Sequence, residues 1–193
     1  MFDLKISTSP EWAPFILNNL NRFLLDHAAC ERKASASAMA FVVRYPDHPE
    51  IVETMIEVAQ EELEHFAMLT TLIHQRGLQH ASDAKDSYVN QLIRLARSKG
   101  QERLLDRLLL FSIIEGRGCE RFGILATALK EDGQEELASV YEELVRSEAR
   151  HHAVGVHFAR KLFPEEVWRI RLDQLLEEEA KIISNLPITA ALH

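Results

Sequence analysis

The amino-acid sequence predicts an all-α protein, a four-helix bundle with additional shorter helices. Its 193 residues are enough for one domain with its own hydrophobic core. The chain holds only 7 glycines and 6 prolines, while 47% of its residues are hydrophobic. Few helix breakers and many helix formers disfavour a β-sandwich, a disulfide framework and a disordered chain. We expect a single domain over residues 1–193.

Proline and glycine bound the first two expected helices. Ser9 and Pro10 are typical of a helix start, with the serine as cap and the proline in the first turn. Pro46 ends this helix, and Gly77 ends the next one. The two expected helices are residues 9–44 and 48–77, followed by a polar loop at 78–87.

The second half of the chain predicts one short helix, two long helices and a final one. Asp132-Gly133 separates the two long helices, and Pro164 opens the last. The expected helices are residues 88–98, 101–130, 134–162 and 164–184, with an irregular tail. The four long helices would each measure about 40–45 Å. Such lengths with short connections are typical of a four-helix bundle.

The charge balance limits the possible partners. With 30 acidic against 22 basic residues the net charge is −8, so nucleic-acid binding would need a local basic patch. The cations are 15 arginines and 7 lysines. An excess of arginine suits phosphate recognition or, more commonly, ion pairs between helices.

Cysteine usage and hydropathy indicate a reduced, cytoplasmic protein. Cys30 and Cys119 both fall within expected helices and form no repeated spacing. The first residues show no secretory signal, and the longest apolar runs are far too short to span a membrane.

Each long helix carries an apolar stripe that a glutamate interrupts near its middle. On the second long helix the stripe reads Ile51, Met55, Val58, Glu62, His65, Leu69 and Leu72. The other stripes contain Glu31, Glu115 and Glu148, and His151 follows Glu148 by three residues, as His65 follows Glu62.

The spacing of these residues resembles an internal duplication. About one Glu-x-x-His is expected by chance in this composition, so a lone copy would carry no weight. Here both copies fall on core stripes, each preceded by a helix with one core glutamate. The halves superpose at offsets of 84 residues for Glu31 and Glu115, and 86 for Glu62 and Glu148.

Four carboxylates in an apolar core predict a metal centre. Each would cost several kcal/mol if it stayed ionised and unpaired, so a strong cationic partner is required. Two Glu-x-x-His pairs with two further glutamates form the ligand set of ferritin-like di-iron bundles. The predicted ligands of two irons or manganeses are Glu31, Glu62, His65, Glu115, Glu148 and His151.

Neighbouring residues leave alternatives open. Four of them would replace ligands if the register were shifted by one residue: Glu61, Glu64, Glu120 and His152. Glu61 could instead orient a ligating histidine, and Ser147 precedes Glu148 as Glu61 precedes Glu62. Cys119 could line an oxygen pocket or be a small core residue. We expect no chemical role for His27, His48, His74, His80, His157 and His193.

Small residues follow two of the predicted ligands. Gly116, Gly118 and Gly123 surround or follow Glu115, and residues 34–38 are alanine and serine. Close helix packing or a substrate cavity would each explain them. Because an iron store needs no organic pocket, the pattern favours an oxygenase.

Four stretches around the predicted ligands resemble the MiaE family of bacterial tRNA hydroxylases. They are LDHAACERKASASAMAF (25–41), EVAQEELEHFAML (57–69), FSIIEGRGCERF (111–122) and YEELVRSEARHHAVGVHFAR (141–160). The contexts ERKASASA and IIEGRGCERF point to this family rather than to di-iron proteins in general.

The resemblance implies a non-haem di-iron monooxygenase with the six residues above as iron ligands. It would use O₂ and two electrons to hydroxylate the isopentenyl group of 2-methylthio-isopentenyl-adenosine at position 37 of tRNA. The chain has no flavin or nucleotide fingerprint and no cluster-binding cysteines. An external electron-donor protein of ferredoxin or reductase type is therefore expected. A ferritin-like iron oxidase or storage protein and a metal-free bundle are the rival interpretations.

A tRNA substrate needs cations on this acidic chain. Residues 94–107 carry a local charge of +3, and two arginines shortly after Glu115 would extend this patch. The candidate tRNA-binding residues are Arg94, Arg97, Lys99, Arg103, Arg107, Arg117 and Arg121. Ion pairs with the abundant glutamates are the alternative for each.

Overall fold

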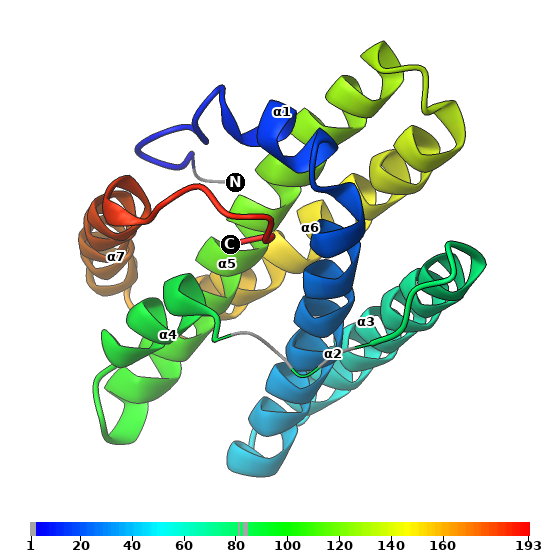
Figure 1. The fold of residues 1–193 in the computed structure, drawn as a ribbon. Coiled ribbons are helices and arrows are strands. Elements are labelled where there is room, and N and C mark those ends of the chain that lie inside the picture. Colours follow the sequence, from blue (N-terminus) through cyan, green and yellow to red (C-terminus); the bar gives the residue numbers. More distant parts are fainter. Residues whose placement is uncertain (1–2, 81, 83–84) are drawn as a thin grey trace. The chain divides into compact units, whose positions relative to one another are not determined.

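The computed structural model describes residues 3–80, 82 and 85–193. In these residues every element of regular secondary structure is a helix (Figure 1). The helices are α1 (Trp12–Leu17), α2 (Leu20–Arg44), α3 (Pro49–Gln75), α4 (Ser87–Arg94), α5 (Gly100–Glu131), α6 (Glu135–Leu162) and α7 (Glu165–Asn185). Within the described ranges, no helix combines the length and apolar character needed to cross a membrane.

The helices divide into two compact units. Unit 1 comprises residues 1–14, 86–189 and 193, and unit 2 comprises residues 15–85 and 190–192. In unit 2, α2 and α3 pack as a helical hairpin. In unit 1, α5 and α6 form a second hairpin, and α4 and α7 pack against α5 and each other. That the two units form one domain stays a prediction.

Two glycines end helices as the sequence predicts. Gly77 and Gly133 have φ angles of 72° and 77°, in the left-handed region that favours glycine. After each glycine the next amide donates back to a carbonyl five residues earlier, from Leu78 to Ile73 at 3.0 Å and from Gln134 to Leu129 at 2.9 Å. These bonds satisfy carbonyls that a helix end leaves open, and the turn at Gly133 joins α5 to α6.

The expected continuous helix over residues 9–44 is wrong, because the chain breaks at Asn18–Asn19 between α1 and α2. The Asn19 amide donates to the Ile16 carbonyl at 2.9 Å, and its side-chain amide donates to the Phe15 carbonyl at 2.9 Å. An asparagine side chain that competes for backbone carbonyls disfavours an uninterrupted helix.

The short helix α4 is also shorter than expected. It ends at Arg94 rather than near residue 98. The Asp86 carboxylate caps its start by accepting from the Val89 amide at 2.8 Å. Tyr88 and Leu92 then bury their side chains with residues of α5 and α7 in the core of unit 1.

Candidate metal centre

Unit 2 brings three of the predicted ligands together. The spacing of Glu62 and His65 places both side chains on one face of α3, and α2 supplies Glu31. His65 Nδ1 lies 3.5 Å from Glu31 Oε2 and 3.4 Å from Glu62 Oε2. Both carboxylates are buried, whereas the His65 side chain keeps 16% of its surface exposed. We call these residues the unit 2 triad.

Unit 1 holds the other three predicted ligands, again two glutamates and one histidine. Glu115 comes from α5, and Glu148 and His151 come from neighbouring turns of α6. One ligand atom of each lies within 4.8 Å of the others, and all three residues are buried. His151 Nδ1 is 3.8 Å from Glu148 Oε2. These residues are the unit 1 triad.

The unit 2 triad is electrostatically coupled. Burial alone would lower the pKa of His65, but hydrogen bonds and charge interactions with Glu31 and Glu62 raise it to about 9. Burial alone would raise the pKa of Glu31, but Glu62 and the imidazoles of His27 and His65 hold it well below the usual range. The triad therefore favours an ionised Glu31 that accepts hydrogen bonds or binds a cation.

His27 is a site residue that the sequence interpretation missed. It lies one turn before Glu31 on α2 and is fully buried. Its Nε2 is 2.5 Å from Glu31 Oε1, the oxygen other than the one near His65. The i, i+4 spacing of a histidine and a glutamate on one helix was the available signal.

The helices α5 and α6 approach closely beside the unit 1 triad. A Cβ on Gly155 would lie 2.0 Å from the Leu108 carbonyl oxygen, and one on Gly116 would lie 2.7 Å from His152 Nδ1. The Ser112 hydroxyl accepts from the Val156 amide at 3.0 Å across the same interface. Close packing therefore explains Gly116.

Gly118 has no such packing reason. It is buried, one turn after Glu115 on α5. Beyond its own helix turn, no atom of the described residues lies within 4 Å of a Cβ built on Gly118. Of the small residues near Glu115, this glycine is the one beside open space.

Several alternative ligands have other partners. Glu120 accepts from the amide and hydroxyl of Thr8 at 3.0 and 2.7 Å. His152 Nδ1 donates to the Ser112 carbonyl at 2.8 Å, and burial lowers its pKa. Glu64 is exposed. Cys119 donates to the Val145 carbonyl at 3.6 Å, so its thiol packs between α5 and α6.

Two of the proposed tRNA-binding arginines lie inside unit 1. Arg117 has no exposed surface and donates to Glu179 Oε1 from Nε at 2.9 Å and from Nη2 at 2.8 Å. Arg121 lies over the Trp12 ring at 5.1 Å, and burial lowers its pKa to about 10. Because a buried guanidinium does not reach a phosphate, we leave both out of the proposed tRNA surface.

The rest of the basic patch is more accessible. Arg94 and Lys99 are exposed, and Arg103 and Arg107 are partly exposed. Arg97 is partly committed elsewhere, since it donates to Asp106 and Glu102, both at 2.8 Å.

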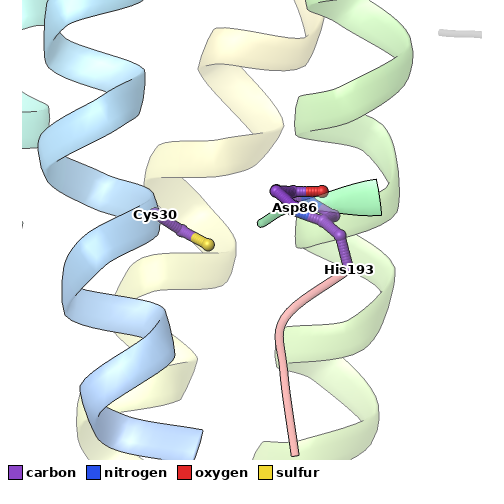
Figure 2. Close-up of side chains that lie close together, drawn as sticks. All are labelled: Cys30, Asp86 and His193. Carbon is purple, nitrogen blue, oxygen red and sulfur yellow. The ribbon is translucent and has the colours of Figure 1, made fainter. Parts of the chain in front are cut away.

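Asp86 and His193 lie side by side at the start of α4, as the close-up in Figure 2 shows. His193 Nδ1 is 3.6 Å from Asp86 Oδ2, and its ring stacks on Tyr88 with centroids 5.0 Å apart. Cys30, also labelled there, belongs to unit 2, where its thiol is 3.7 Å from Asp26 Oδ2. Asp86 already caps α4, so we assign this pair no chemistry.

Comparison with known proteins agrees with the motif pattern. The family model described as tRNA-(MS[2]IO[6]A)-hydroxylase (MiaE) matches residues 2–193. The chain belongs to the MiaE family. A Pseudomonas putida relative named tRNA 2-(methylsulfanyl)-N(6)-isopentenyladenosine(37) hydroxylase is 34% identical over 145 residues, which cover 75% of this chain and 69% of the relative. A Salmonella typhimurium relative of the same name is 30% identical over 161 residues, covering 82% of this chain. The matched residues cover only 56% of the length of that relative.

A solved structure is similar over the whole chain. "Protein 43 with aldehyde deformylating oxygenase activity from Synechococcus" has a TM-score of 0.93 and 31% identity to this MiaE-family chain. The similarity covers 100% of this chain and 96% of the other. With the helical content of both units, it confirms the predicted ferritin-like, four-helix class with additional shorter helices.

Proposed function

We propose that this protein is a non-haem di-iron monooxygenase that hydroxylates the isopentenyl side chain of 2-methylthio-isopentenyl-adenosine at position 37 of tRNA. The observation that carries the proposal is the pair of Glu-Glu-His triads with buried carboxylates, in a family whose curated relatives are named for this hydroxylation. The reaction takes up O₂, two electrons and two protons, and yields the alcohol and one water.

Each triad would hold one iron ion. Two carboxylates and one imidazole supply oxygen and nitrogen donors, which suit iron or manganese and leave coordination positions open. Glu31, Glu62 and His65 would hold one ion, and Glu115 with the Glu148/His151 pair the other. Two bound irons supply the activation of O₂ that hydroxylation of an unactivated C–H bond requires. In this proposal both units form one ferritin-like domain over residues 1–193.

The chain's own side chains would bind the substrate and exclude water. The carboxylates of both triads are buried, which would keep bulk solvent from them and protect a strong oxidant from side reactions. A Cβ on Gly118, one turn from Glu115, would meet no atom of the described residues within 4 Å beyond its own helix turn, and we propose that the branched five-carbon group enters on this side.

The exposed cations after α4 would bind the tRNA backbone. We propose Arg94, Lys99, Arg103 and Arg107 as the main contacts, with Arg97 contributing through its exposed edge. An acidic protein can hold RNA through such a local patch because neutralising phosphates releases counterions. The electrons would come from a separate donor protein, and we expect the enzyme to work in the cytoplasm.

Single-turnover chemistry tests this function. The iron-loaded, chemically reduced protein is mixed with O₂ and tRNA that carries the unhydroxylated nucleoside, and the nucleosides are analysed by mass spectrometry. We expect one oxygen atom to be added per turnover. Glu148→Ala should lose iron and activity, whereas Glu143→Ala, an exposed glutamate on the same helix, should retain both.

Aldehyde deformylation is the second candidate, favoured by the Synechococcus structure. A long-chain aldehyde is therefore offered in a parallel reaction. Turnover of the aldehyde but not of the tRNA would reject the hydroxylase. Iron accumulation beyond two ions per chain would favour an iron store, and tight stoichiometric zinc without any O₂-reactive iron would reject both oxygenases.

A further inference from the structure

The histidine before Glu31 is placed to hold one of that residue's carboxylate oxygens. His27 is fully buried, and its ring lies 5.7 Å from that of Phe23, one turn earlier. His27 Nε2 lies 2.5 Å from Glu31 Oε1. A carboxylate that binds a metal ion is ionised and can only accept hydrogen bonds, so His27 Nε2–H would be the donor in the metal-bound protein. With Oε1 held in this way, Oε2 is the oxygen directed to His65, at 3.5 Å.

The other half of the duplication lacks this donor. Glu31 and Glu115 are equivalent at an offset of 84 residues, which pairs His27 with Phe111. Phe111 is buried one turn before Glu115 and carries no hydrogen-bond donor on its side chain. The two triads thus have the same ligand types but differ at this position, where only the unit 2 triad has a histidine.

We propose that His27 is a positioning residue that orients Glu31 for metal binding and makes the two metal positions inequivalent, with the unit 2 triad dependent on this hydrogen bond. The inference rests on the proposed function, because it requires that the triads bind metal. It adds a residue that is not itself a ligand.

The physical reason is the conformational freedom of glutamate. A carboxylate on a flexible side chain must be ordered to bind an ion, and a buried hydrogen bond supplies that order before the ion arrives. Loss of such a supporting bond typically lowers metal affinity about 10–100-fold. Glutamine at position 27 keeps an N–H donor at a similar reach, whereas leucine keeps only apolar bulk.

Cobalt(II) titration of the full-length protein tests this proposal. The metal is added against a competing chelator while the visible ligand-field bands of cobalt are recorded, so that affinity and coordination are read without turnover. For wild type we expect two sites. For His27→Leu we expect one site to weaken about 10–100-fold with altered bands, the other site to be unchanged, and His27→Gln to recover most of the loss.

Phe111→Leu is the matched control, because it changes the equivalent buried position without removing a hydrogen bond. It should leave both cobalt affinities within about threefold of wild type, and melting of the metal-free proteins reports any loss of fold. Wild-type binding at both sites in His27→Leu overturns the proposal. So does equal weakening of both sites in His27→Leu and His27→Gln, which would indicate a role in folding alone. If wild type binds no cobalt or iron, the proposed function fails as well.

Discussion

Replacing Arg117 by methionine should destabilise the protein rather than weaken tRNA binding. The guanidinium donates to Glu179 Oε1, to Glu120 Oε2 at 2.5 Å and to the Ile6 carbonyl at 3.0 Å. Glu179 has no exposed surface, and its other neighbour in this network is Tyr88, whose hydroxyl donates at 2.9 Å. Methionine would fill part of the volume but leave the Glu179 carboxylate buried without the cation that donates hydrogen bonds to it.

The expected loss of stability follows from the buried Glu179 carboxylate, which would lose its hydrogen-bonded cation. Removing one partner of a buried ion pair costs about 3–5 kcal/mol, because the remaining charge loses its compensation. For a chain of this length each kcal/mol lowers the melting temperature by about 2–4 °C. The expected fall for Arg117→Met is therefore roughly 6–20 °C.

Thermal melting by circular dichroism measures this fall, and tRNA affinity is measured on the folded protein at a lower temperature. Arg117→Met/Glu179→Gln should recover part of the loss, since the second substitution removes the uncompensated charge. Arg160→Met, an exposed arginine on α6, is the control and should melt within about 2 °C of wild type. An unchanged melting temperature together with weakened tRNA binding would refute the buried placement of Arg117.

Three further outcomes are expected. Lys99→Ala/Arg103→Ala should raise the apparent KM for tRNA and reduce the salt slope of binding, which is roughly 0.7–0.9 per phosphate contact; an unaltered slope would place the RNA surface elsewhere. Gly118→Leu should block hydroxylation while iron loading persists, and normal turnover would show that the substrate does not use this space. In the metal-free protein the pKa of His65 is raised from 6.5 to about 9, so its stabilising contribution is complete below pH 6.5 and is lost as pH rises through about 9. Melting temperatures across that range should fall less for His65→Gln than for wild type, and parallel curves would contradict the coupling.

The sequence could predict which glutamates and histidines share a buried helix face because their register is local; that they bind metal stays a prediction. An i, i+3 pair on an apolar stripe fixes which helix face Glu62 and His65 share, and the structure brings each pair to a glutamate on the neighbouring helix. The predicted ends at Gly77 and Gly133 were equally local, since a left-handed residue stops a helix within its own turn. That the triads share one metal centre stays a prediction.

The features that the sequence did not predict depend on the choice of a side-chain partner, which hydrophobic periodicity does not contain. Arg117 and Glu179 are 62 residues apart, so no periodicity separates a buried ion pair from a surface cation. The helix break at Asn19 depends on whether its side-chain amide donates to a backbone carbonyl or to water. The two states differ by about 1 kcal/mol, and the pattern of apolar residues does not report this difference. His27 was discounted because a core histidine is common, and only the 2.5 Å contact assigns its partner.

The close contact between α5 and α6 limits how far apart the two backbones beside the unit 1 triad can move. At Gly155 the helices are as close as backbone atoms allow, and Gly116 gives them a second point of contact at His152. Glu115 lies on one helix and the Glu148/His151 pair on the other, so the close contact fixes the distance between the two backbones that carry them. Protein interiors compress little, and such a site does not widen readily for Ca²⁺, which takes six to eight oxygen ligands at about 2.3–2.6 Å. If the unit 1 triad binds metal as proposed, this position would therefore favour small transition metals that accept a nitrogen ligand over alkaline-earth ions.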